Sequence, residues 1–284
     1  MSIINQLKTW PWSRPLSTRL LPIMVILGIF LILGFYTVTD PARIDNNYVL
    51  NGADYVGYAV CHRITDRSFA IAGRQLPLCA RCTGMYLGIS LAFLVLLLAG
   101  RQRWSNLPPL SVLIALGLFI LAMAFDGLNS YSHFFPDFPH LYEPKNWLRL
   151  VTGMGTGLAM GIIIFPALAQ TLWKQQIIRP SVANLKELLG FVILALIFIT
   201  LVLSNQPLIL YVLGLVSAAG VLIILTSVNT TAVLIVFKRD ATAEKYRQIV
   251  IPLMIGLFLA ITQVAVISVF RFTLTGTMNG FPGL

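Results

Sequence analysis

The sequence predicts an all-α, polytopic integral membrane protein with about seven transmembrane helices, forming one membrane domain over residues 1–284. Hydrophobic residues make up 57% of the chain and charged residues only 11%, whereas soluble domains carry about 25% charged residues. Apolar stretches of about 17 or more residues recur, each long enough to cross the hydrocarbon core of a bilayer. This composition excludes a soluble globular protein, and it excludes intrinsic disorder, which requires low hydrophobicity and high charge.

The expected membrane spans are 20–38, 83–100, 108–125, 150–172, 187–203, 208–236 and 248–270. Helices are expected because each helix satisfies its own backbone hydrogen bonds inside lipid. The first span follows Lys8, Arg14 and Arg19, as a signal sequence would. Its apolar run is long, however, and residues 37–40 offer no small-residue cleavage site, so we expect an uncleaved anchor.

The distribution of Lys and Arg predicts a cytoplasmic N-terminus and an outer C-terminus. In this orientation the inner segments hold twelve of the 20 basic residues and three of the ten acids. We therefore expect a multi-pass protein of the cell (inner or plasma) membrane, with the lipid bilayer as its surroundings. The net charge of +10 does not indicate nucleic-acid binding, because the basic residues lie in short gaps between apolar spans.

All cysteines and histidines fall in two expected outer loops, residues 39–82 and 126–149. The first loop contains Cys61, His62, Cys79 and Cys82, and the second contains His133 and His140. Within the first loop, residues 72–75 have the composition of a turn between two short extended arms. Such a hairpin would return Cys61 and His62 to the Cys-x2-Cys pair. Three thiolates and one imidazole satisfy tetrahedral zinc, so the pattern favours a zinc site.

Two other uses of the cysteines remain open from the spacing alone. Cys79 and Cys82 precede an expected helix N-terminus, with Arg81 between them. Both features lower the pKa of a thiol, so the pair could exchange disulfides with a partner in an oxidising compartment. A purely structural disulfide that pins the loop is the third interpretation.

The residues around the cysteines resemble the signature of a known family. The resemblance rests on Cys61-His62-Arg63, Arg67-Ser68-Phe69, Gly73-x-Gln75-x-Pro77-x-Cys79-x-Arg81-Cys82-Thr83-Gly84, and a second patch with Asp126-Gly127 and Asn146-x2-Arg149-x2-Thr152-Gly153. It covers roughly residues 55–165 and is similar to the prokaryotic membrane proteins called domain of unknown function 2085. The resemblance supports the choice of site residues and implies no reaction.

Five arginines accompany the cysteines: Arg63, Arg67, Arg74, Arg81 and Arg149. Guanidinium groups match phosphate and carboxylate groups in two-pronged geometry, so the arginines could hold an anionic headgroup or solute. The alternative is that they reach ordinary lipid phosphates or pair with nearby acids. Asp126 is expected at the outer end of its span in an ion pair with Arg149, although a metal-ligand or proton-acceptor role is also open.

Two further patterns concern helix packing. Small residues recur at Gly84 and Gly88 in one span and at Gly153, Gly157 and Gly161 in another, so we expect these two helices to pack closely. Asn229 and Gln263 are polar residues within the last two spans. Counted from the span centres they lie about 16 Å apart along the membrane normal, which predicts no hydrogen bond between them.

These observations favour an integral membrane protein with an outward-facing Cys/His metal site, formed by Cys61, His62, Cys79 and Cys82 and surrounded by arginines. A membrane thiol-disulfide oxidoreductase using Cys79 and Cys82 is the first alternative. A transporter or flippase for an anionic solute or lipid is the second. No reaction follows from the motif, in which Asp66 is the single carboxylate.

Overall fold

The computed structural model describes residues 32–40, 44–133, 135 and 141–278. Six helices in this part are long and apolar enough to cross a membrane, which confirms an all-α polytopic membrane protein. They are α5 (Ala80–Leu98), α6 (Leu110–Ser132), α7 (Asn146–Leu172), α8 (Leu185–Leu203), α9 (Pro207–Val236) and α10 (Tyr246–Thr275). The expected first span, 20–38, lies mostly outside the described residues, although residues 32–38 are helical.

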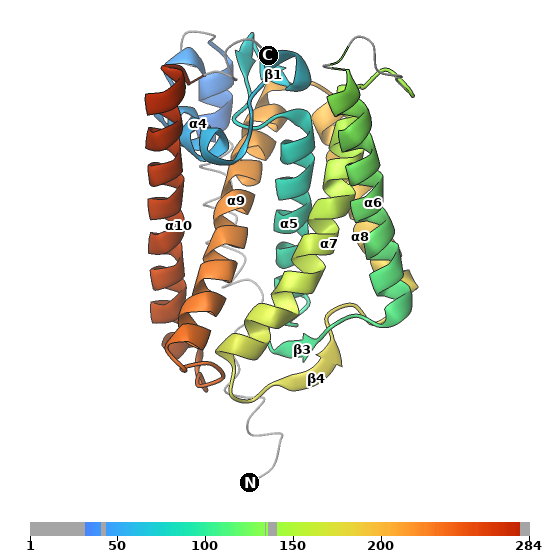
Figure 1. Cartoon of the computed structure of the whole chain (residues 1–284), viewed down its shortest axis with the longest axis vertical. Coiled ribbons are helices and arrows are strands. Elements are labelled where there is room, and N and C mark those ends of the chain that lie inside the picture. The colour runs from blue at the N-terminus through green and yellow to red at the C-terminus, as the bar shows by residue number, and fades with distance from the viewer. Residues whose placement is uncertain (1–31, 41–43, 134, 136–140, 279–284) are drawn as a thin grey trace.

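The helices form a bundle whose two ends differ in structure (Figure 1). One end carries the short elements α4 (Tyr48–Val60), η2 (Thr65–Arg67), β1 (Ala70–Ile71) and β2 (Arg74–Gln75). We call residues 44–79 the cysteine lobe. The other end carries β3 (Trp104–Asn106) and β4 (Ile177–Pro180), which pair in parallel, together with the loop between α9 and α10. We call this the basic end.

The cysteine lobe contains the expected hairpin and one helix that the sequence did not predict. Strands β1 and β2 pair antiparallel around a two-residue turn. In this turn Ala72 and Gly73 have φ of +49° and +89°, the backbone that tight hairpins require. Helix α4 is an addition, and its Asn47 N-cap accepts a hydrogen bond of 2.9 Å from the Leu50 amide.

Helices α6 and α10 end later than their hydropathy suggested. Helix α6 continues to Ser132 rather than 125, so the second loop begins after residue 132 instead of at 126. The continuation includes Asp126 and Ser130, which are polar but buried. Hydropathy therefore falls before the helix ends, because the polar side chains find partners within the protein. Helix α9 also runs unbroken through its polar stretch 226–231.

The contact between α5 and α7 is made through glycine, as the small-residue patterns predicted. A Cβ atom at Gly84 would lie 2.2 Å from the Leu150 carbonyl oxygen. One at Gly153 would lie 2.1 Å from the carbonyl oxygen of Arg81. Real Cβ contacts are never this short, so only glycine lets the two backbones approach to this distance. The start of α7 is thereby fixed against the segment that carries Cys82.

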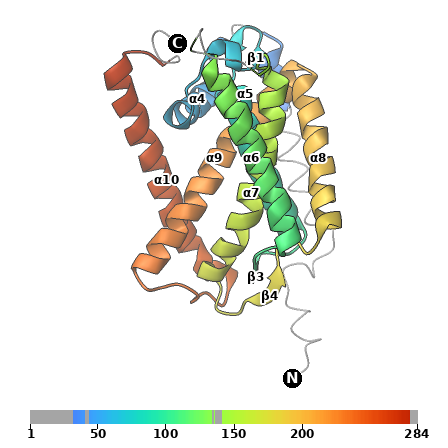
Figure 2. The same ribbon diagram turned by 45° about the vertical axis from the view of Figure 1, so that its right-hand side comes forward.

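The expectation that Asn229 and Gln263 are too far apart to bond was wrong. Their amide groups exchange two hydrogen bonds, of 3.0 and 3.1 Å. The expected separation of about 16 Å assumed that the centres of the two spans lie at one depth. Helices α9 and α10 instead cross near the basic end and diverge toward the cysteine lobe (Figure 2). At the crossing a Cβ on Gly256 would lie 2.1 Å from Thr230 Oγ1. The pair joins two helices, as amide side chains in lipid often do.

Gly157→Ala is expected to destabilise the bundle, since its Cβ would lie 1.9 Å from the Met85 carbonyl oxygen. Overpacking of this kind costs about 1–3 kcal/mol of unfolding free energy. Gly117→Ala, in α6, is the matched control because its Cβ would meet nothing within 4 Å. Unfolding titrations in mixed micelles should show a loss for Gly157→Ala only; equal stability of the two variants would contradict the close contact.

Candidate functional site

Cys61 is brought to Cys79 by the close packing of α4 on the chain that precedes α5. A Cβ at Gly57 would lie 1.9 Å from the Pro77 carbonyl oxygen, so glycine is required for this contact. Cys61 ends α4, and its amide donates a hydrogen bond of 2.8 Å to the Gly57 carbonyl. Cys79 is the N-cap residue of α5, and Cys82 lies in its first turn.

The three cysteines form one cluster, which confirms that the lobe folds back on the Cys-x2-Cys pair. All three are free, and their sulfur atoms lie within 4.8 Å of one another. Cys61 and Cys79 are buried, with 4% and 2% of their surface exposed. Three thiolates bound to one zinc ion at about 2.3 Å would lie about 3.8 Å apart. The cluster is therefore compatible with a metal ion.

The sulfur of Cys61 accepts hydrogen bonds from its neighbours in the cluster. Hydrogen bonds from the thiols of Cys79 and Cys82 lower the pKa of Cys61 well below its ordinary value. The backbone amide of Cys79 adds a hydrogen bond of 3.3 Å to the same sulfur. Conversely, donating to Cys61 raises the pKa of Cys79 to about 12. A metal ion could take the place of the thiol protons in this cluster, because cysteine binds a metal in its deprotonated form.

His62 lies beside the cluster but is not a member of it. Its ring nitrogens are outside the group of atoms within 4.8 Å. A hydrogen bond from its side chain nevertheless helps to lower the pKa of Cys61, and its Nε2 atom is buried without a hydrogen-bond partner. In the second loop, His133 Nε2 contacts the Tyr142 carbonyl at 3.0 Å, away from the cysteines. His140 lies outside the described residues.

Arg271, near the end of α10, holds the backbone of the site in place. Its guanidinium donates to the carbonyl oxygens of Tyr58 (2.6 Å), Cys61 and His62 (3.2 Å). The same group lies 4.1 Å from the centre of the Tyr58 ring. Arg271 was not among the expected site residues. It directly follows the last expected span, 248–270, and this position was the available signal, because a charge so close to the hydrocarbon core requires a partner.

Arg63 and Arg74 are held by a single carboxylate within the lobe. Asp54 Oδ1 accepts from Arg63 at 2.9 Å, and Asp54 Oδ2 accepts from Arg74 at 2.7 Å. Arg74 also donates to the Asn51 side chain at 2.7 Å. Burial lowers the pKa of Arg63, whereas Asp54 opposes that shift. These two arginines join the hairpin and the chain after Cys61 to α4, as the pairing alternative anticipated.

Asp126 forms an ion pair with Arg81 and not with Arg149, which corrects the expected pairing. Arg81 donates to Asp126 Oδ2 and also to Ser130 Oγ at 3.2 Å. Tyr142 donates a hydrogen bond of 2.9 Å to the other carboxylate oxygen. Asp126 was assigned to Arg149 because both were expected at one depth. Asp126 lies in the extra turns of α6, where the side chain of Arg81, one residue before Cys82, reaches it instead.

Arg149 is the buried arginine without a carboxylate in the described part of the chain. Only 6% of its surface is exposed. Its NH1 group donates to the Asn146 side chain at 2.8 Å, and its Nε is buried without a partner. The charges of Arg67 and Arg81 repel it, whereas the more weakly acting charge of Asp126 attracts it. Burial and the charge of Arg81 also lower the pKa of Arg67.

Fold and site together define a class of protein: a polytopic helical membrane protein with a three-cysteine cluster at one end of its bundle. The chain belongs to the family described as predicted membrane protein, domain of unknown function 2085, whose sequence profile matches residues 61–163. The match begins at Cys61 and covers α5, α6 and most of α7. Helices α4, α8, α9 and α10 lie outside it.

Two archaeal relatives support this assignment. An uncharacterized protein of Methanothermobacter thermautotrophicus is 31% identical over 104 residues, which cover 37% of this chain and 83% of the relative. An uncharacterized protein of Methanocaldococcus jannaschii is 28% identical over 116 residues, which cover 41% of this chain and 68% of the relative. No solved structure matches the chain.

Asp126→Ala is expected to lower the free energy of unfolding by about 3 kcal/mol, because it leaves Arg81 without its buried counter-charge. The side chain of Asp126 is only 2% exposed. Glu244→Ala is the matched control, since it breaks the exposed Lys174–Glu244 pair at the basic end. That variant should unfold like the parent protein. A parent-like Asp126→Ala would show that the buried pair contributes nothing to stability.

Proposed function

We propose that the protein carries a structural or catalytic metal ion, most consistent with zinc, bound by the thiolates of Cys61, Cys79 and Cys82. The mutual approach of the three sulfurs to within 4.8 Å carries this proposal. His62 is the proposed fourth ligand, since its side chain forms a hydrogen bond with Cys61 and its Nε2 is buried without a partner. Sulfur and imidazole are the ligands that zinc prefers in sites of this kind.

Burial favours a metal site over the thiol-disulfide alternative. Exchange requires that a sulfur be attacked by, or attack, a thiol of another protein, so it must be accessible. Cys61 has the lowered pKa that a nucleophile needs, but only 4% of its surface is exposed. Cys79, one member of the Cys-x2-Cys pair, is 2% exposed, and Cys82, the other member, is partly exposed. A metal ion needs no such access once it is bound.

The cysteine lobe is proposed to face the outside of the cell (inner or plasma) membrane. Basic residues of the opposite end support this orientation, because Lys and Arg accumulate in cytoplasmic loops. Those of the described loops and adjoining helix ends are Arg101, Arg103, Lys174, Arg179, Lys186, Lys238, Arg239, Lys245 and Arg247. Outside the cell, a bound metal would also protect neighbouring thiols from oxidation to disulfides.

A second proposal is that Arg149, with Arg67 and Arg81, binds an anion beside the metal site. The observation that favours it is the burial of Arg149 without a carboxylate partner. Three guanidinium groups that repel one another are stabilised by an anion with several oxygen atoms. A phosphate, either free or as a lipid headgroup, has this chemistry. Arg63, Arg74 and Arg81 contribute less than Arg149, because Asp54 and Asp126 already neutralise part of their charge.

Metal binding is tested by elemental analysis and thiol counting on the same purified protein. The expected result is about one zinc ion per chain with no thiol accessible to reagent until the metal is chelated. A double Cys79→Ser and Cys82→Ser variant should contain no metal, and His62→Ala should bind it more weakly. His133→Ala, whose histidine lies outside the cluster, is the control and should keep full occupancy.

Arg271→Gln should weaken zinc binding by about 10–100-fold, as the loss of groups that support metal ligands commonly does. The reason is that the carbonyls of Cys61 and His62 lose their donor. Competition with a chromogenic chelator measures the affinity. Protein that folds without any metal, and whose three thiols all react freely, would exclude the metal site.

Anion binding is tested by titrating inorganic phosphate while the melting temperature is measured. Phosphate should stabilise the parent protein and have no effect on Arg149→Gln, whereas the metal content of this variant stays unchanged. Arg179→Gln, at the basic end, serves as control. Nanodiscs with and without phosphatidylglycerol separate a lipid headgroup from a free anion. Equal stabilisation of the Arg149→Gln variant would refute the assignment.

A further inference from the structure

Two cavities of different character adjoin each other at the cysteine lobe, where α4 lies beside the end of α10 (Figure 1). The first, of about 340 Å³, is lined by Asn51, Asp54, Arg63, Arg74 and Gln75; we call it the arginine pocket. The second, of about 550 Å³, is lined by Gly52 and Val56 of α4 and by Ile261, Ala265, Val269 and Phe272 of α10; we call it the α4–α10 groove. Tyr55 and Met278 belong to the walls of both, so one ligand can occupy the two cavities together.

The α4–α10 groove is apolar and faces the lipid. Ile261, Val269 and Phe272 in its lining are exposed residues of a helix that is long and apolar enough to cross a membrane. From Ile261 to Phe272 the lining rises by about 16 Å along α10, which is close to half of a hydrocarbon core of about 30 Å. Ser268 donates to the Tyr55 carbonyl at 2.9 Å, and none of the described lining residues is charged. The groove therefore suits a hydrocarbon chain.

The arginine pocket carries one uncompensated positive charge. Its lining contains the guanidinium groups of Arg63 and Arg74 but a single carboxylate, that of Asp54. Asp54 binds both arginines, one with each oxygen, and so fixes the two guanidinium groups beside each other. Asp45 is exposed and contacts Arg74 through its main-chain carbonyl at 3.1 Å. A ligand with one negative charge would balance this lining.

Two hydrogen-bond donors of the arginine pocket are available to a ligand. Arg74 donates to the Asn51 side-chain oxygen at 2.7 Å, which leaves the Asn51 amide nitrogen without an acceptor among the described residues. The side chain of Tyr55 is 56% exposed, as is common for tyrosine at a membrane interface. Gln75 is already engaged by Ser68 and Thr65. An amide and a phenol beside two guanidinium groups match the oxygen atoms of a phosphate.

We propose that the arginine pocket and the α4–α10 groove together bind one anionic glycerophospholipid, with its phosphodiester in the pocket and one acyl chain in the groove. The phosphodiester has the single negative charge that the lining lacks, and its oxygens accept from Asn51 and Tyr55. A zwitterionic headgroup would add an ammonium group that the two arginines repel, while both carboxylate oxygens of Asp54 are already engaged. The site shares no residue with the proposed metal ligands or with the anion site at Arg149.

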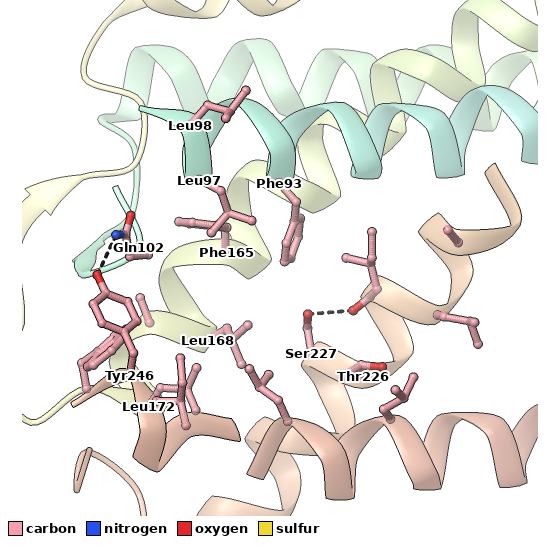
Figure 3. A pocket seen from close by; sticks show the side chains of 18 residues that line it. Phe93, Leu97, Leu98, Gln102, Phe165, Leu168, Leu172, Thr226, Ser227 and Tyr246 are labelled. Carbon is pink, nitrogen blue, oxygen red and sulfur yellow. Dashed lines mark hydrogen bonds between the residues drawn. The ribbon is translucent and has the colours of Figure 1, made fainter. Parts of the chain in front are cut away.

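The combination of a charged pocket with an apolar groove selects this ligand, and volume alone would not. A cavity of about 680 Å³ lies among α5, α7, α9 and α10 at the other end of the bundle (Figure 3). None of the described residues in its lining is charged, and two of the polar ones, Gln102 and Tyr246, bind each other at 2.7 Å. Its lining therefore defines no headgroup, whereas the arginine pocket does.

The test measures lipid binding to the purified full-length protein by native mass spectrometry. The probes are phosphatidylglycerol, phosphatidylcholine with the same acyl chains, oleate, and glycerophosphoglycerol, which has the headgroup without the chains. We expect one tightly held phosphatidylglycerol per chain, bound at least about tenfold more tightly than any other probe. Equal binding of phosphatidylcholine or oleate would overturn the selection of a phosphodiester, and equal binding of glycerophosphoglycerol would overturn the role of the groove.

A charge variant locates the headgroup. Asn51→Asp keeps the acceptor that Arg74 uses but brings the net charge of the lining to zero, so phosphatidylglycerol should bind no better than phosphatidylcholine. Gln206→Glu is the matched control, because it adds the same charge before α9, outside the arginine pocket. Arg149→Gln should keep the bound lipid. Loss of the lipid from Arg149→Gln, with retention by Asn51→Asp, would place it at the other anion site and refute the proposal.

A matched pair of variants on α10 locates the acyl chain. Ala265→Phe fills the α4–α10 groove, whereas Val266→Phe places the same ring on a neighbouring residue that is exposed and outside the lining. Only Ala265→Phe should lose phosphatidylglycerol. If Ala265→Phe does not fold, Gly52→Leu fills the groove from α4, where a Cβ atom meets nothing within 4 Å. Unchanged binding by a folded groove variant would contradict the placement of the chain.

Discussion

The approach of two backbones at the α5–α7 contact is the constraint on which the rest of the structure depends. Gly153 of α7 lies against the Arg81 carbonyl, one residue from Cys82, so the first turn of α5 cannot shift without displacing α7. Gly57 makes a similar contact between α4 and Pro77. Together these glycines remove the side chains that would separate α4, α5 and α7, and the three sulfurs meet where the backbones converge.

Much of the architecture could be predicted because its signals are local. Apolar length predicted the six described spans, glycine spacing predicted the α5–α7 contact, and turn residues predicted the hairpin at Ala72–Gly73. The meeting of Cys61 with the Cys-x2-Cys pair followed from that hairpin. What could not be predicted depends on depth and rotation. The partner of Asp126 was predicted wrongly, because hydropathy does not predict the extra turns of α6. The Asn229–Gln263 hydrogen bond was not predicted, because hydropathy does not predict where α9 and α10 cross.

The arginines near the cysteines differ in their carboxylate partners, which their positions in the sequence did not predict. Arg63 and Arg74 close the lobe on Asp54, and Arg81 joins α5 to α6 through Asp126. Arg149 is buried without such a carboxylate, and charge in an apolar setting is expensive unless it is compensated.

Arg271 has a consequence for the order of assembly. The carbonyls that it binds belong to the segment around Cys61, but the arginine itself is more than two hundred residues downstream, on the final helix. A nascent chain whose three cysteines have already left the ribosome still lacks the hydrogen bonds from Arg271. The thiols therefore reach their final arrangement only after the last span has entered the bilayer, and until then they depend on the redox state of their surroundings.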